Sequence, residues 1–305
     1  IQNSGYEVTT NVTAIKKKDF SLSLNLNVSF NQNKFLDFPT NIVDEQIDIT
    51  NGKYPVKAEI GKPVGSFFGF RYLGVYPTTA DAVAKNADGT VKLDPYGKPI
   101  PMNYNGVYPF KGGDAIYQDI NYDGRIDLDD VVYLGDSNPD VAGGFGFNMK
   151  YKGLQLNAQF LYRYGYEIVN DVALNAEGMS DRDNQSKAVL NRWRVSGQNF
   201  PNMLPRAYLS HPANNLGSDR YVEDASFLRL NNVSLNYSFP KSVLKRLSVS
   251  NLKVGLQARK LFTVTNYSGQ DPEVRIRRDG ALPFGRDNGS VPPPIITAFN
   301  ISVGF

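Results

Sequence analysis

Long stretches in which apolar and polar residues alternate one by one constrain this chain most. The clearest stretch, 19–30, reads DFSLSLNLNVSF, and a second, 154–167, reads LQLNAQFLYRYGYE. Because successive side chains of a strand point to opposite faces, each stretch predicts a strand with one apolar and one polar face. The second predicts a single strand of 14 residues, well beyond the ~5–6 typical of globular proteins. Its apolar face ends in three tyrosines, Tyr162, Tyr164 and Tyr166, as at a membrane interface.

Five further segments alternate in the same way: 6–14, 145–151, 226–239, 252–258 and 296–305. Within 226–239 the apolar parity switches, which predicts a β-bulge near Asn231–Asn232. The last segment ends on Phe305, a terminal signature of bacterial outer-membrane barrels; the alternative is an ordinary edge strand. Together these strands predict an all-β, antiparallel transmembrane β-barrel fold.

The composition excludes several other classes of protein. Mean hydropathy is −0.37 and no run of ~18 apolar residues occurs, which excludes a transmembrane helix but not a barrel. The absence of Cys excludes disulfide scaffolds and thiolate metal sites. The single His, His211, argues against a histidine-based triad and a multi-histidine metal site. A net charge of +3 on 305 residues does not predict nucleic-acid binding. No nucleophile–base constellation is present, so we expect no catalytic residues and no enzyme.

Short and long connections alternate along the chain. The short ones are 15–19, 152–153 and 240–251, and the long ones are 30–141, 168–225 and 267–295. Outer-membrane barrels have short periplasmic turns and long extracellular loops. This parity predicts seven membrane strands, with residues 61–76 inside a large extracellular insertion, 31–140, and with a second extracellular loop at 169–224.

Seven strands cannot close a bacterial barrel, which has an even number of strands and no edge exposed to lipid. We therefore expect residues 1–305 to be the C-terminal part of a larger barrel, with further sequence upstream of Ile1. Two alternatives remain open: a passive porin-like channel, and a secreted β-sandwich that binds a ligand.

Residues 119–130, DINYDGRIDLDD, place oxygen-bearing groups at the spacing of a calcium loop. The predicted ligands are Asp119, Asn121, Asp123, the carbonyl of Arg125, Asp127 and Asp130. Gly124 stands where the loop turns sharply. Asp130 is shorter than the usual bidentate Glu, which lowers the expected affinity. A structural Ca²⁺ is the only cofactor expected, and the alternative is a metal-free Asp/Gly turn.

Several aromatic residues of the two long loops are candidates for contact with a partner or a substrate. They are Phe67, Phe68, Phe70, Tyr72 and Trp193. The alternative, favoured for the three phenylalanines, is that they pack the core of their own loop. Residues 180–194 predict a short helix that carries Trp193 and has Ser180 as its N-cap.

Four segments in order along the chain resemble the SusC/RagA family of TonB-dependent outer-membrane transporters. They are GKPVGSFFGFRYLGVY (61–76), GDAIYQDINYDGRID (113–127), DASFLRLNNVSLNYSFP (224–240) and TNYSGQDPEV (265–274). The resemblance implies a 22-stranded, plugged barrel in the outer membrane of a Gram-negative, Bacteroidetes-type bacterium. It also implies import of a glycan or oligopeptide, energy from TonB–ExbB–ExbD, and a SusD-type surface lipoprotein as partner. The TonB box, the plug and most barrel strands of that family are absent from this chain.

Overall fold

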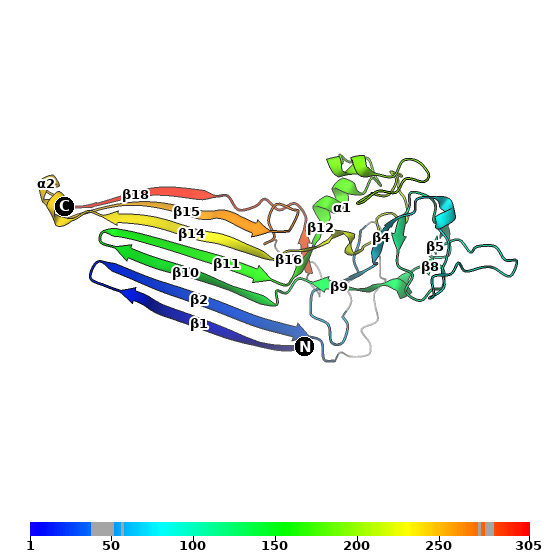
Figure 1. Ribbon diagram of the computed structural model, residues 1–305, viewed down its shortest axis with the longest axis horizontal. Coiled ribbons are helices and arrows are strands. Elements are labelled where there is room, and N and C mark those ends of the chain that lie inside the picture. Colours follow the sequence, from blue (N-terminus) through cyan, green and yellow to red (C-terminus); the bar gives the residue numbers. More distant parts are fainter. Residues whose placement is uncertain (38–51, 56–57, 274–275, 278–283) are drawn as a thin grey trace.

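The computed structural model describes residues 1–37, 52–55, 58–273, 276–277 and 284–305. Parts of the predicted 31–140 insertion and of the 267–295 loop, together with the end of the 265–274 segment, lie outside the described residues. The molecule is elongated, with a sheet of long strands at one end and a lobe of short elements at the other (Figure 1). No helix of the described residues is long and apolar enough to cross a membrane.

Seven long strands form one sheet, in which each strand is antiparallel to its neighbours. Their order across the sheet is β1 (Gln2–Lys16), β2 (Phe20–Lys34), β10 (Val141–Tyr151), β11 (Leu154–Tyr164), β14 (Phe227–Ser238), β15 (Asn251–Thr265) and β18 (Ile296–Gly304). The strand number and the antiparallel pairing predicted from the alternation are confirmed.

The pairing register sorts the side chains of the sheet into apolar and polar rows. One row crosses all seven strands with apolar residues only: Ile15, Leu22, Met149, Leu156, Leu235, Leu256 and Phe299. A neighbouring row is polar except at its last residue: Thr13, Ser23, Asn148, Asn157, Ser234, Gln257 and Ala298. Because paired residues share a face and adjacent residues do not, the two rows lie on opposite faces of the sheet.

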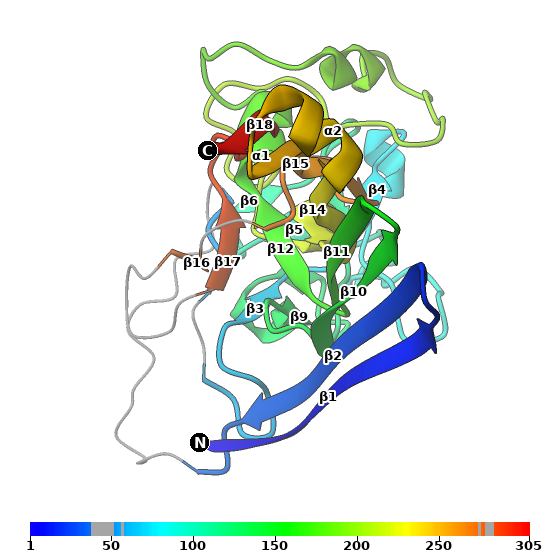
Figure 2. The ribbon, with the colours of Figure 1, turned by 90° about the vertical axis from the view of Figure 1, so that its left-hand side faces the viewer.

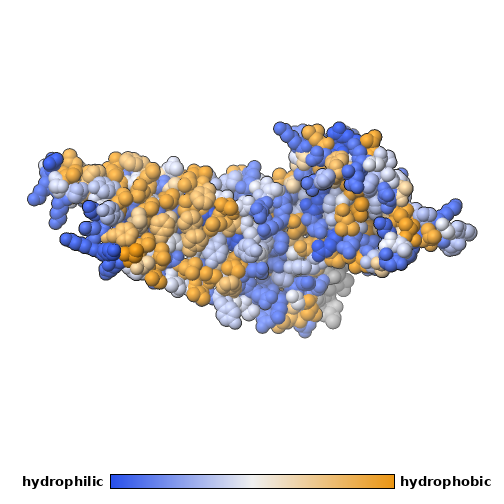
Figure 3. Space-filling model, viewed as in Figure 1, coloured by the Kyte–Doolittle hydropathy of each residue, from blue (hydrophilic) through white to orange (hydrophobic). Residues whose placement is uncertain are grey.

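The apolar face of the sheet is open to its surroundings. Leu24 is 45% exposed, Leu256 57% and Phe299 67%, and apolar residues cover much of the sheet in Figure 3. In the described part of the chain the other sheets have two to four short strands, and none of them covers this face. A β-sandwich would bury it, so the sandwich alternative is disfavoured.

All short connections lie at one end of the sheet and all long ones at the other (Figure 1). Residues 17–19 join β1 to β2, Lys152–Gly153 join β10 to β11, and the helix α2 (Lys241–Leu247) lies between β14 and β15. Figure 2 looks at this end of the molecule, with β1 and β18 at opposite ends of the series of strands. The predicted alternation of connections is confirmed, although α2 itself was not predicted.

Two irregularities in register align the apolar faces. The predicted bulge is confirmed, since the β14–β15 register shifts between Leu230 and Asn232. A second shift in β1, between Thr13 and Ile15, was not predicted. It brings Ile15, rather than Ala14, opposite Leu22, and so extends the apolar row onto β1.

The predicted 14-residue strand from Leu154 is wrong at its far end. β11 stops at Tyr164, and Gly165 follows with φ +74°. This left-handed conformation turns the chain out of the sheet. Tyr166 is therefore buried in a cluster with Phe227, and only two of the three predicted girdle tyrosines remain on the long strand.

The lobe consists of short strands and helices from all three long connections. Its strands are β3 (Ser66–Gly69), β4 (Tyr72–Val75), β5 (Asn103–Tyr104), β6 (Tyr108–Pro109), β7 (Ala115–Tyr117), β8 (Arg125–Ile126), β9 (Val132–Asp136), β12 (Glu167–Asn170), β13 (Val222–Asp224), β16 (Ile276–Arg277) and β17 (Phe284–Asp287). Its helices are α1 (Asp171–Glu177) and the 3₁₀-helices Thr79–Asp81, Leu128–Asp130, Lys187–Asn191 and Asp219–Tyr221. A common core joins Phe70 and Ile126 of the first loop to Leu216 of the second. The two predicted loops therefore pack together as one lobe.

The helix predicted over 180–194 is wrong in extent and cap. Only Lys187–Asn191 is helical, as a 3₁₀-helix. Its N-cap is Ser186, whose hydroxyl accepts a hydrogen bond from Ala188 N. Ser180 instead accepts a backbone bond from Ser210.

Candidate functional site: the lobe beyond the sheet

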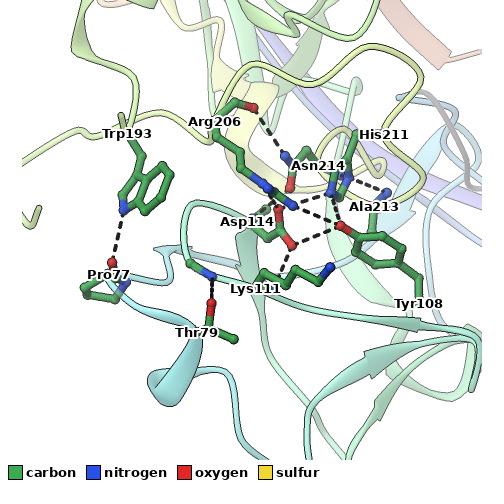
Figure 4. Close-up of polar contacts among 12 residues, drawn as sticks. Pro77, Thr79, Tyr108, Lys111, Asp114, Trp193, Arg206, His211, Ala213 and Asn214 are labelled. Carbon is green, nitrogen blue, oxygen red and sulfur yellow. Dashed lines mark hydrogen bonds and ion pairs between the residues drawn. The ribbon is translucent and has the colours of Figure 1, made fainter. Parts of the chain in front are cut away.

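A buried carboxylate, Asp114, joins the two long loops. Its side chain has no exposed surface and accepts a bond of 2.7 Å from Arg206 Nε and one of 2.8 Å from Lys111 N. His211 Nε2 lies 3.1 Å from the carboxylate and the Tyr108 hydroxyl 3.4 Å (Figure 4). Arg206 and His211 come from the second loop, and the other groups from the first. The cluster therefore holds the loops together at one point.

The hydrogen bonds of His211 fix its tautomer. Nδ1 accepts bonds of 3.0 Å from the backbone N–H groups of Ala213 and Asn214, so Nδ1 carries no proton. The neutral ring then carries its proton on Nε2, which faces Asp114 and the Tyr108 hydroxyl. Nδ1 thus holds the backbone after the ring, and Nε2 is the atom that faces the rest of the cluster.

The environment of Asp114 favours its ionised form. Burial alone would raise the pKa of this carboxyl, but hydrogen bonds from His211 and Arg206 outweigh it and hold the pKa below its usual range. No role was predicted for His211 from the sequence, and the cluster was not predicted. Arg206 and His211 are 92 and 97 residues from Asp114 in the sequence, and no local spacing relates them to it.

The three phenylalanines proposed as contact residues are buried. Phe67 and Phe68 are each 1% exposed and Phe70 is fully buried. Phe70 packs against Tyr117 with ring centroids 5.5 Å apart, and Phe68 packs edge-on against Tyr133. Their rings are therefore out of reach of a ligand or partner in this structure. This agrees with the alternative that they pack the core of the loop.

Tyr72 and Trp193 are half-buried. The Tyr72 ring lies under the guanidinium of Arg220, 5.2 Å from its centroid. Trp193 Nε1 donates a bond of 3.0 Å to the carbonyl of Pro77 (Figure 4). Its ring lies against Gly113, where a Cβ atom would clash with it. Both residues therefore help to fasten the loops, and each keeps some surface for contact.

The predicted calcium loop is closed by its own backbone. Asp119 accepts bonds from Asp123 N and Gly124 N, Asn121 accepts one from Asp123 N, and Asp123 accepts one from Arg125 N. Asp127 caps the following 3₁₀-helix by accepting a bond from Asp129 N. Among the described residues, no group of three or more acidic or histidine side chains is arranged to hold a metal ion.

Asp130 links the two ends of this loop. It is almost fully buried and accepts bonds from Ile120 N at 2.7 Å and from Asp127 N at 3.1 Å. Burial raises the pKa of this carboxyl to about 6. Because the folded state then binds the extra proton, the ionisation of Asp130 costs stability as pH rises through about 6.

A second set of ion pairs anchors the rim of the sheet. Arg229 on β14 is almost fully buried and pairs with Asp271 at 2.5 Å and Glu273 at 2.7 Å. Glu273 also pairs with Arg163 at 3.2 Å. Both arginines lie on long strands, and both acids lie in the loop after β15. The pairs thus fix that loop to the sheet at the end where the lobe begins.

Comparison with known proteins gives relatives of one kind. No family model matches the chain. It is 29% identical over 300 residues to the TonB-dependent receptor P3 of Formosa agariphila, covering 96% of this chain and 27% of the relative. It is 26% identical to the TonB-dependent receptor SusC of Bacteroides thetaiotaomicron, covering 94% of this chain and 25% of SusC. The chain thus spans about a quarter of the length of these relatives.

Solved structures agree in fold. A chain of the RagAB peptide transporter superposes with a TM-score of 0.62 at 24% identity, covering 88% of this chain and 26% of that one. The open-open state of the RagAB peptide importer gives the same score at 21% identity. The sequence relatives support a SusC/RagA-type TonB-dependent receptor for this chain, and the solved structures share its fold.

Proposed function

We propose that the chain forms part of the wall and the outer lobe of a transporter that imports oligomeric nutrients across a bacterial outer membrane. The observation that carries this proposal is the apolar row across all seven strands, whose face stays exposed. An exposed apolar face of this extent needs a nonaqueous neighbour, and lipid is the neighbour that suits alternating strands with a polar opposite face.

The polar face would then line the interior of a larger barrel, closed by strands outside this chain. Among the described residues, β1 and β18 are the edge strands of the sheet, and a barrel wall has no open edge in lipid. The lobe lies at the end of the long connections, which we assign to the outside of the cell. Residues 31–140 and 169–224 are thus proposed as extracellular.

Energy and partners are proposed from the relatives. Two of them are named TonB-dependent receptors, so we propose that a TonB–ExbB–ExbD complex drives import through a segment outside this chain. We also propose a SusD-type lipoprotein on the outer lobe, where Tyr72 and Trp193 keep some surface. The cargo is proposed only as an oligomer, either a glycan or an oligopeptide.

The test is energy-dependent uptake by cells with and without the intact gene. Fluorescently labelled oligosaccharides and oligopeptides too large for porins are supplied, and a protonophore is added to half of each culture. We expect uptake that requires the gene and stops with the protonophore. Uptake that requires the gene but continues with the protonophore would identify a passive channel, and uptake that is independent of the gene would refute import.

We further propose that residues 119–130 bind one structural Ca²⁺, supported by their ligand spacing and by the closed form of the loop. Saturating Ca²⁺ should raise the melting temperature of the lobe, since ~100-fold excess over Kd adds about 2.7 kcal/mol. Asp123→Ala should abolish this shift, whereas Asp129→Ala, at a position without a ligand role, should retain it. Equal melting temperatures in Ca²⁺ and in EDTA would contradict the proposal.

A further inference from the structure

A pocket of about 420 Å³ opens on the lobe beside strands β4 and β7. Its apolar wall includes Leu73 and Ile116 and three tyrosine rings, Tyr76, Tyr117 and Tyr122. Tyr76 and Tyr117 are buried in the core of the lobe, so this wall is part of its rigid interior. Leu73 and Tyr122 are exposed at the edge. A small, mainly apolar cavity with a few polar groups has the form of a ligand site.

Two carboxylates at this pocket are held in place by the backbone. Asp81 accepts bonds from Thr78 N at 2.9 Å and from the Thr78 hydroxyl at 2.7 Å. Asp119 accepts bonds from Gly124 N at 2.9 Å and from Asp123 N at 3.2 Å. An ionised carboxylate has about four acceptor positions, so both can still accept from a ligand. Their fixed orientation lowers the cost of ordering on binding.

The charges of the pocket favour a cation. Asp81 and Asp119 are opposed by one positive side chain, Lys85, and the fourth polar residue of the lining, Gln118, is neutral. The lining therefore has a net charge of −1 at neutral pH. The faces of tyrosine rings also attract organic cations. A positively charged nitrogen thus has both a carboxylate and an aromatic surface within the same cavity.

We propose that this pocket binds an arylalkylammonium group, in which a ring-sized apolar body carries a cationic nitrogen. The ring occupies the wall of Leu73, Ile116 and the tyrosines, and the nitrogen faces Asp81 and Asp119. The proposal is independent of transport, because it concerns equilibrium binding by the lobe and requires neither an energy source nor a partner.

Isothermal titration calorimetry on the intact protein in detergent tests the ligand class. The buffer contains EDTA, so that Ca²⁺ does not occupy Asp119. Tyramine is the probe, 4-ethylphenol offers the same ring without charge, and ethylamine offers the charge without a ring. We expect tyramine to bind more tightly than either and cellobiose not to bind. Equal affinities for tyramine and 4-ethylphenol, no binding of tyramine, or preferential binding of cellobiose would overturn the proposal.

A tripeptide amide with an N-terminal tyrosine separates the two sources of this group. Tighter binding of the tripeptide than of tyramine would assign the pocket to the end of a longer chain. Binding of tyramine but not of the tripeptide would assign it to a free small amine. Either result supports recognition of the arylalkylammonium group.

Two carboxylates of the lobe provide a matched pair of variants. Asp88, like Asp81, accepts from the N–H and the hydroxyl of one threonine, Thr90, at 2.9 and 2.6 Å, but it is outside the pocket lining. Asp81→Asn should weaken tyramine binding roughly threefold to fivefold, as for a solvent-accessible ion pair, and Asp88→Asn should not change it. Equal effects of the two variants would contradict the proposal.

Lys85→Met gives a result that loss of folding cannot imitate. Removing the opposing cation from an exposed position should tighten tyramine binding, because only the two carboxylates then act on the ligand. Affinity for 4-ethylphenol should stay unchanged. Weaker or unaltered tyramine binding in Lys85→Met would refute an electrostatic role for this pocket.

Discussion

Replacement of Leu24 by arginine is expected to destabilise the membrane-inserted protein by about 2–4 kcal/mol, the cost of a cation on the lipid face of a barrel near mid-membrane. Leu24 lies on the apolar face between Val12 of β1 and Phe147 of β10 and is 45% exposed, so the arginine would have no protein partner there. The measurement is equilibrium unfolding of the intact protein in lipid vesicles.

The control for this variant is one residue away on the same strand. Ser23→Arg places the same side chain on the polar face, where Ser23 pairs with Asn148 on β10. We expect a change below about 1 kcal/mol, because a surface substitution in a wet environment is nearly neutral. Similar losses of unfolding free energy for Leu24→Arg and Ser23→Arg would mean that the two faces of the sheet do not lie in different environments, lipid and water.

Asp114→Ala is expected to destabilise the lobe by about 3–5 kcal/mol, the usual cost of removing one partner of a buried ion pair. Arg206 would lose its carboxylate, and His211 Nε2 would lose one of its two acceptors. Hydrogen exchange should then accelerate in residues 193–215, while the long strands remain protected. The exposed Asp181, in the same lobe, provides the control Asp181→Ala, which should leave exchange unchanged. Unaltered exchange in Asp114→Ala would contradict the joining role of the cluster.

The same carboxylate predicts a loss of stability in acid. The pKa of Asp114 is lowered in the folded protein, so its contribution is complete above the unfolded value of about 3.9 and is lost as pH falls through the lower folded pKa. The melting temperature of the lobe in the wild type should therefore fall as pH drops below ~4. Asp114→Asn should remove this part of the acid dependence, and an unchanged acid limb would contradict the assignment.

The sheet could be predicted from the sequence because its information is local. Each strand displays its two faces through the alternation of its own residues, as in 19–30, and this pattern survives in any register that keeps the apolar face together. The features of the sheet that were not predicted arise at single residues. Gly165 ends β11 by a left-handed turn, and the shift at Thr13 and Ile15 changes parity in a stretch whose alternation is weak.

The lobe was much less predictable, because its structure depends on contacts between distant segments. Packing within their own loop was favoured for Phe67, Phe68 and Phe70, but the sequence could not show that the second loop shares these cores. Val169 packs in one core with Phe67, and Leu216 packs in another with Phe70. His211 stands in a polar, proline-containing stretch, and its role becomes visible only with Asp114 beside it. The calcium spacing of 119–130 is local and was recognised, and its metal remains a proposal.

The most direct test of the account is the accessibility of spin labels along β15 in the intact protein in lipid bilayers. The chain has no cysteine, so it adds no background when single cysteines are introduced from Leu252 to Arg259. We expect a period of two. Oxygen dissolved in the lipid should speed the spin relaxation of labels at Leu252, Val254, Leu256 and Ala258, and a water-soluble nickel complex should speed that of the intervening labels. Labels on the apolar face that neither reagent reaches would indicate a buried core and would contradict the membrane wall.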